Sequence, residues 1–316
     1  MFEHIMPPFG PVEENGLLQR LQHPQGAVDV VLDTDTYNEI DDQFALAYLI
    51  LHDDKLRLQA IYAAPFSNEK APGGPAEGMQ LSRDEILHII GLMKRDDLKD
   101  RVYAGSKAYL SDEKMPVDSP AARDLACRAM NYTSEAPLYV IAIGAITNIA
   151  SALLLAPAIR DRITVIWLGG HALHWHDNKE FNLRQDIAAA RIVLGCGAAV
   201  VLLPCMGVVS AFATTEPELR ENLKGKNELC DYLYSYTVSE VSARKEMKCW
   251  SKPIWDVTAI GWPLNKRFMR DAIIAAPIPE YDGHWGFDPR RHWIRYIYQI
   301  ERDLLFEDLF NTLTHI

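Results

Sequence analysis

The chain has 316 residues, with 43 acidic against 32 basic side chains and a formal net charge of −11 at pH 7. This negative charge argues against a nucleic-acid backbone as partner, because like charges repel. Hydrophobic residues make up 48% of the chain, which suits a globular core, and no uncharged apolar run reaches the roughly 18 residues of a membrane span.

The beginning of the chain carries no recognisable targeting signal. Met1-Phe2-Glu3-His4 has neither a basic start nor an apolar run, so we expect no signal peptide. The cysteines form no metal-type spacing, and their odd number suits reduced thiols; they are Cys127, Cys196, Cys205, Cys230 and Cys249. We therefore predict a cytoplasmic protein.

Residues 1–26 are rich in Pro, Gly and Glu and predict an irregular lead-in. Beyond them, short apolar runs lack polar alternation, as do strands buried on both faces of a parallel sheet: 28–32, 56–63, 138–143, 164–168 and 199–203. Helical patterns lie between these runs, at 79–94, 120–131, 148–155 and 186–195. The sequence predicts a single α/β domain over residues 1–316, with an open, mostly parallel, Rossmann-like sheet flanked by helices.

The strand and helix rhythm weakens beyond about residue 204. Helices are expected near 217–224 and 227–247, before a Trp-rich segment at 250–262 and a final amphipathic helix near 290–310. We expect these segments to cover the carboxyl edge of the sheet, where loops carry function in this architecture.

Acidic side chains crowd the end of the first predicted strand. Asp33, Asp35, Glu39, Asp41 and Asp42 fall within ten residues, between an apolar strand and an apolar helix. This position is the carboxyl edge of the sheet, where open α/β proteins bind ligands. Because crowded carboxylates either take up protons or hold a cation, we predict a bound cation.

The acidic stretch has other interpretations. Asp41 and Asp42 could merely stabilise a helix N-terminus, but this leaves Asp33 and Asp35 unexplained. An EF-hand loop would need Gly and Glu at places where the chain has neither. The strand-to-acid transition also resembles the opening motif of haloacid-dehalogenase-type phosphatases, which depend on Mg²⁺, with Asp33 as nucleophile and Asp35 as acid/base. That alternative stays open.

The same stretch resembles the opening motif D-T-D-P-G-x-D-D of the inosine/uridine nucleoside hydrolases. Asp33, Asp35, Asp41 and Asp42 match its four acids. Five residues separate Asp35 from Asp41 where the family has three, and the usual Pro-Gly is missing. The resemblance implies the nucleoside hydrolase fold and hydrolysis of the N-glycosidic bond of ribonucleosides.

Two later segments resemble the ribose-binding motifs of this family. Asn68 follows the second strand, where the family has an Asn in its ribose pocket, although an Asn there is often only a turn former. Glu180-Phe181-Asn182 follows a strand that ends in Gly-Gly and matches a motif whose Glu and Asn hold ribose hydroxyls. The resemblance implies that the sugar is bound by Asp41, Asn68, Glu180 and Asn182.

Two other segments resemble metal-binding motifs. Residues 144–150 resemble G-x-L-T-N-x-A, whose Thr carbonyl coordinates calcium, and Thr147 is also suited to cap the next helix. Asp256 follows Trp255, as in the Trp-Asp dipeptide of the purine-specific members. The resemblance implies a Ca²⁺ cofactor, which suits such oxygen ligands better than Mg²⁺ does, held by Asp35, Asp42, the Thr147 carbonyl and Asp256.

The resemblance also implies catalytic roles. The reaction passes through an oxocarbenium-like sugar, so Asp35 would accept the proton of the attacking water and Asp33 would orient the neighbouring acids. A single Trp such as Trp255 would by itself indicate only a core aromatic. The resemblance implies instead that Trp255 stacks against the leaving base, with Tyr109 opposite. Because purines carry a basic N7 that solvent can protonate and an indole supplies no titrating proton, we predict a preference for purine nucleosides.

Three histidines follow the Gly-Gly strand end: His171, His174 and His176. Their spacing suggests zinc, but a fourth ligand of soft type is missing and carboxylates dominate the site. His174 stands six places before Glu180, where the family usually has an Asn. His174 could still donate a hydrogen bond to the sugar, and His174 or His176 could act as the acid that helps the base leave.

The resemblance finally implies a homodimer or homotetramer that takes a nucleoside as its small-molecule substrate. Besides the phosphatase, a homologue that binds calcium and ribose without turnover remains an alternative, because two motifs depart from the family pattern.

Overall fold

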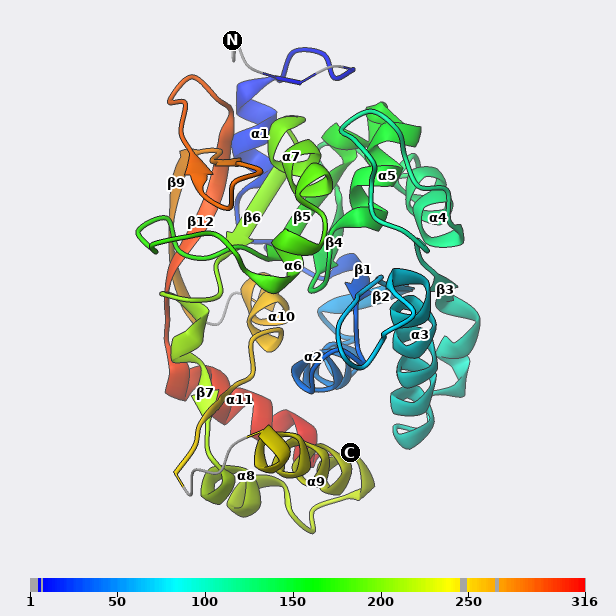
Figure 1. Cartoon of the computed structure of the whole chain (residues 1–316), viewed down its shortest axis with the longest axis vertical. Coiled ribbons are helices and arrows are strands. Elements are labelled where there is room, and N and C mark those ends of the chain that lie inside the picture. Colours follow the sequence, from blue (N-terminus) through cyan, green and yellow to red (C-terminus); the bar gives the residue numbers. More distant parts are fainter. Residues whose placement is uncertain (1–4, 7, 245–248, 265–266, 316) are drawn as a thin grey trace.

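The structure, a computed structural model, describes residues 5–6, 8–244, 249–264 and 267–315. Its centre is an eight-stranded sheet (Figure 1). The strands are β1 Val28–Thr34, β2 Leu56–Ala63, β3 Val102–Ala104, β4 Leu138–Ala142, β5 Ile163–Leu168, β6 Ala199–Leu203, β9 Met269–Ala275 and β12 Trp293–Ile300. They lie in the order β3-β2-β1-β4-β5-β6-β12-β9, and only the β12–β9 pair is antiparallel. The predicted open, mostly parallel α/β sheet is confirmed.

Helices cover both faces of the sheet, as the apolar strands require. Val30 and Leu32 of β1 pack in one buried layer with α2 Asp41–Ile50, α3 Pro75–Leu92 and α10 Val257–Leu264. Val31, which points to the opposite face, packs in a second layer with α4 Pro120–Ala129, α5 Thr147–Leu155 and α7 Ile187–Gly195. The strands are therefore buried on both sides, which explains their lack of polar alternation.

The prediction of one helix near 290–310 is wrong. Residues 293–300 form β12, which lies between β6 and β9, and the helix α11 spans Arg302–Thr314. The β-branched and aromatic residues of this segment favour a strand with neighbours on both sides. Strand β9 was not predicted at all. Together, β9 and β12 extend the sheet at one edge.

Three helices that follow β6 pack against α11 or α2, next to the sheet. They are α8 Glu216–Leu223, α9 Glu228–Arg244 and α10, and Figure 1 shows α8, α9 and α11 together at the lower end of the view. The predicted end of α9 near residue 247 lies outside the described residues. Within the described part of the chain, no helix has both the length and the apolar surface that a bilayer crossing requires.

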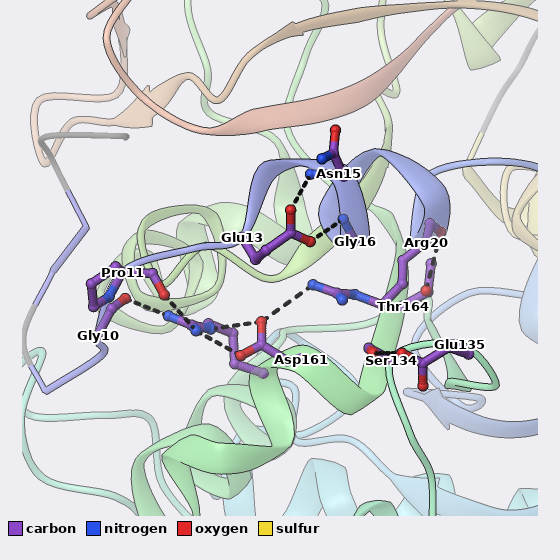
Figure 2. Close-up of polar contacts among 11 residues, drawn as sticks. Gly10, Pro11, Glu13, Asn15, Gly16, Arg20, Ser134, Glu135, Asp161 and Thr164 are labelled. Carbon is purple, nitrogen blue, oxygen red and sulfur yellow. Dashed lines mark hydrogen bonds and ion pairs between the residues drawn. The ribbon is translucent and has the colours of Figure 1, made fainter.

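The lead-in is not wholly irregular, because it contains helix α1, Glu14–Arg20. Glu13 caps the helix: its carboxylate accepts hydrogen bonds from the backbone N–H groups of Asn15 and Gly16 (Figure 2). Arg20 and Arg160 both donate to Asp161, and Arg160 also donates to the carbonyls of Gly10 and Pro11. Helix α1 was not predicted, because it is short and its cap is Glu13 in place of one of the usual cap residues Ser, Thr, Asp or Asn.

Several smaller elements complete the chain. They are the 3-10 helices η1 Asp96–Arg101, η2 Pro157–Arg162 and η3 Val209–Ala211, the helix α6 Phe181–Gln185, and the short strands β7 Ala213–Thr214, β8 Lys252–Pro253, β10 Ile278–Pro279 and β11 Trp285–Gly286. Strands β7 and β8 pair with each other, as do β10 and β11. The β7–β8 pair ties the segment just before Trp255 and Asp256 to the part of the chain that follows β6.

Helix α3 packs directly on the loop that follows β2, which predicts a strict need for glycine. A Cβ at Gly78 would lie 2.0 Å from the carbonyl oxygen of Phe66. We expect Gly78→Ala to lower the melting temperature by ~2–6 °C, because helix and loop must separate. The matched control is Gly91→Ala in the same helix, where a Cβ would meet nothing within 4 Å; it should leave the melting temperature unchanged or raise it. Equal melting temperatures for the two variants would contradict the close packing.

Candidate active site

Four aspartates from the two ends of the chain converge at the carboxyl edge of the sheet. Asp35 follows β1, Asp41 and Asp42 begin α2, and Asp256 immediately precedes α10. All four are buried and line one cavity of about 170 Å³. Carboxylate oxygens of Asp41, Asp42 and Asp256 lie within 4.8 Å of one another. The expected meeting of these acids around one cavity is found.

The turn between β1 and α2 fixes two of these acids. Thr34, the last residue of β1, donates a hydrogen bond from its hydroxyl to Asp42 at 2.5 Å. The backbone N–H of Asn38 donates to the carbonyl of Asp35 at 2.7 Å, which closes the turn. Asp33 points elsewhere: it accepts a hydrogen bond from Asn148 at 2.7 Å and does not line the cavity.

The acids repel one another strongly. Burial raises the pKa of Asp42 to about 8, and the charge of Asp41 adds to the rise. Burial, followed by the neighbouring carboxylates, also raises the pKa values of Asp35 and Asp256 well above their usual range. Within the described residues, Asp35 Oδ2 and Asp41 Oδ1 are buried and accept no hydrogen bond. Such a cluster must take up protons or bind a cation.

The aspartate cluster offers only oxygen atoms as metal ligands, and this fits a hard cation. Calcium and magnesium bind carboxylates and other oxygen ligands, whereas zinc prefers nitrogen and sulfur. Among the described residues, the cation that neighbours the cluster is Lys252, whose ammonium pairs with Glu39 and lies 3.8 Å from Asp41 Oδ1. Burial alone would lower the pKa of Lys252, but the carboxylates of Asp41 and Glu39 outweigh it and raise the pKa. A single ammonium leaves most of the negative charge uncompensated.

Glu180 and Asn182 line the same cavity, at the start of α6. The Glu180 carboxylate accepts hydrogen bonds from the backbone N–H groups of Gly170, Asn182 and Leu183, at 2.8 to 2.9 Å. Asn182 donates through Nδ2 to the carbonyls of Ile143 and Leu168. Its amide is thereby oriented, and none of the described residues donates a hydrogen bond to its oxygen.

Trp255 lies on the cavity wall next to Asp256. Phe181 and Met206 line the same space and provide further apolar surface. The cavity thus combines a cluster of carboxylates with an aromatic and apolar lining.

The structure does not bring every predicted residue to the cavity wall. Asn68 is turned towards Asn38, to which it donates a hydrogen bond at 2.8 Å. Tyr109 donates its hydroxyl proton to Gln185, and Thr147 donates its hydroxyl proton to Asp186 at 2.8 Å. None of the three lines the cavity. Their predicted contacts with sugar, base and metal stay predictions.

His174 and His176 are exposed and do not line the cavity, whereas His171 does. His171 directly follows the Gly-Gly at the end of β5, and Cys205, another cavity residue, stands just beyond β6. Neither residue was predicted to belong to the site. The rule that ligands bind beyond the carboxyl ends of parallel strands would have found them.

The longer turn of the first motif adds polar groups to the cavity wall. Asn38 and Glu39 both line it. Asn38 binds Asn68 in the loop after β2, and Glu39 binds Lys252 in β8. The longer turn therefore joins three loops around the cavity.

A sequence model of the family described as inosine-uridine preferring nucleoside hydrolase matches residues 30–295. The chain belongs to the nucleoside hydrolase family. It is therefore a hydrolase that acts on N-glycosyl bonds, and the phosphatase alternative is wrong. The matched region contains every acid of the cluster and the Glu180-Phe181-Asn182 motif.

Individual nucleoside hydrolases resemble the chain in sequence or in fold. The non-specific ribonucleoside hydrolase RihC of Salmonella typhimurium is 28% identical over 224 residues, which cover 66% of this chain and 70% of that protein. The plant nucleoside hydrolase PpNRh1 has the same fold, with a TM-score of 0.73 at 18% identity, over 92% of this chain and 99% of that one. A purine-preferring ribonucleoside hydrolase from Gardnerella vaginalis has a TM-score of 0.67 at 18% identity, over 90% and 98% of the two chains.

The raised pKa values predict how a cation changes stability with pH. The folded state keeps protons on these carboxyls up to about pH 8 for Asp42, whereas the unfolded state loses them near its ordinary pKa of about 4. Without a divalent cation, stability should therefore fall as pH rises through this window. A cation that replaces the protons should raise the melting temperature more at about pH 8 than at about pH 5.5.

Thermal unfolding with Ca²⁺ or with a chelator, at both pH values, measures this difference. Asp256→Asn removes one acid of the cluster and should lose most of the cation-dependent increase. An increase that is equal at both pH values would show that the cation does not bind at these carboxylates.

Proposed function

We propose that the protein catalyses the calcium-dependent hydrolysis of the N-glycosidic bond of ribonucleosides, with a preference for purines, giving ribose and free base. The observation that carries this proposal is the convergence of Asp35, Asp41, Asp42 and Asp256 on one cavity that Glu180 and Asn182 also line. The relatives support it: RihC is named as a non-specific ribonucleoside hydrolase, and the Gardnerella vaginalis protein is named as purine-preferring.

The donor set favours calcium as the cofactor. Asp35, Asp42 and Asp256, with the carbonyl of Thr147, would supply oxygen ligands, and Ca²⁺ accepts six to eight of these in loose geometry. When bound, the ion would orient a water molecule and make it more acidic. Asp35 has a buried oxygen that accepts no hydrogen bond from the described residues, and it is the group that would take the proton of that water.

The remaining polar groups suit a ribose ring. Carboxylates accept hydrogen bonds from sugar hydroxyls, and Asp41 and Glu180 present such oxygens to the cavity. A cavity of about 150 Å³ can hold a benzene molecule, so the 170 Å³ found here accommodates a five-membered sugar. As the C1′–N bond breaks, the ring becomes positively charged, and the surrounding carboxylates stabilise that charge.

The test of the function is the release of reducing sugar from a panel of ribonucleosides in the presence of Ca²⁺. We expect release from purine nucleosides above pyrimidine nucleosides, and loss of release after chelation. Asp35→Asn should reduce kcat by ~10²–10⁴, the usual contribution of a general base. Ribose binding in calorimetry without any release of sugar would contradict turnover and would favour the inactive binding homologue.

Trp255 should matter through the leaving base. We expect Trp255→Ala to lower kcat/KM for inosine by ~10- to 100-fold, since stacking on an aromatic side chain contributes ~1–3 kcal/mol per base. A nitrophenyl riboside has a good leaving group, so its hydrolysis should change far less. Steady-state kinetics on both substrates provide the measurement, and equal losses on the two would rule out a role at the leaving base.

A further inference from the structure

We propose that His171 donates a hydrogen bond from Nε2 to the departing base and so helps to select which bases are released. The inference rests on the proposed function and assigns to it a residue that the motifs of the sequence do not indicate. His171 is the histidine that lines the cavity, whereas His174 and His176 are exposed.

The backbone of His171 is held from two sides. Its N–H donates to Asn178 Oδ1 at 2.8 Å, and its carbonyl accepts from the indole N–H of Trp285 at 2.9 Å. The preceding Gly170 has a φ of +73°, and a Cβ there would lie 2.6 Å from the Trp285 ring. This position therefore requires glycine, and the resulting turn sets the direction in which His171 leaves β5.

A contact from the next strand end determines the tautomer of the ring. The backbone N–H of Met206 donates to His171 Nδ1 at 3.3 Å. A backbone N–H can only donate, so Nδ1 must carry the lone pair, and a neutral ring then carries its proton on Nε2. Burial lowers the pKa of His171, which favours the neutral ring. Among the described residues, none hydrogen-bonds Nε2.

The chemistry of the cavity assigns this free N–H to the base. Sugar hydroxyls are donors that the many carboxylates of the wall can accept. A nucleobase instead presents ring nitrogens and carbonyl oxygens, which need a donor. His171 is a donor whose proton position is fixed and whose ring is held in place by Met206, so it meets this need at little entropic cost.

The step balances without a proton leaving His171. The C1′–N bond breaks, and the base departs with the bonding electron pair. Water forms the new C1′–O bond and gives one proton to a carboxylate. The Nε2–H group hydrogen-bonds to the base as negative charge develops on it, and solvent supplies the final proton. A hydrogen bond to a charged group contributes a factor of ~10 to 100 in rate.

Two substitutions separate this role from a structural one. In His171→Asn the amide oxygen can still accept the Met206 N–H, but no donor remains at the Nε2 position. In His171→Gln the longer amide places an N–H near that position instead. We expect the Asn variant to lose ~10- to 100-fold in kcat/KM for inosine and the Gln variant to lose less. Both variants should hydrolyse a nitrophenyl riboside nearly as fast as the wild type.

The opposite order would overturn the proposal. If His171 only holds the Met206 segment, the Asn variant should keep its activity. The Gln variant should then lose activity, and by the same factor on inosine and on the nitrophenyl riboside. Calorimetric affinity for hypoxanthine gives a readout that does not need turnover. Wild-type protein that cleaves neither substrate would refute the proposed function, and the affinities still decide the role of His171. Hypoxanthine binding that is weaker in the Asn variant than in the Gln variant supports the role of His171. Equal affinities of the two variants for hypoxanthine refute it.

Discussion

The site depends on a fold that holds mutually repelling carboxylates together in one buried cluster. Asp41, Asp42 and Asp256 have oxygens within 4.8 Å of one another, and Asp35 shares their cavity. Burial of such charges is costly unless they are neutralised. The packing of the apolar helices α2 and α10 against the sheet provides the rigid frame that keeps these acids together. The uncompensated negative charge of the cluster suits the binding of a cation and, in the proposed reaction, of a sugar that becomes positively charged.

The other parts of the cavity follow from the parallel sheet. Parallel strands all end at the same edge, so the residues just beyond β1, β5 and β6 meet there although they are far apart in the sequence. The segment that carries Trp255 and Asp256 arrives from the other end of the chain through the β7–β8 pair. Glu180 both caps α6 and lines the cavity, so a single carboxylate supports the local fold and forms part of the cavity wall.

The sequence predicted those features that depend on local chemistry. Apolar runs located the five central strands within one or two residues, and the acid motif located the cluster. Long-range packing was less accessible: residues 293–300 were expected to be helical, and their pairing with β6 and β9 decides the strand. At the site, motif matching favoured His174, but the turn at Gly170 brings His171 to the wall. Asn38 and Glu39 escaped prediction because they lie in the part of the first motif that departs from the family.

The most direct measurement is a crystal structure of the protein grown with Ca²⁺, in which anomalous scattering identifies the ion. The account predicts one calcium ion bound by carboxylates from both ends of the chain, with Asp42 and Asp256 among its ligands. An ion bound elsewhere, or a well-ordered cluster in which Asp42 and Asp256 bind no ion in saturating calcium, would contradict the account.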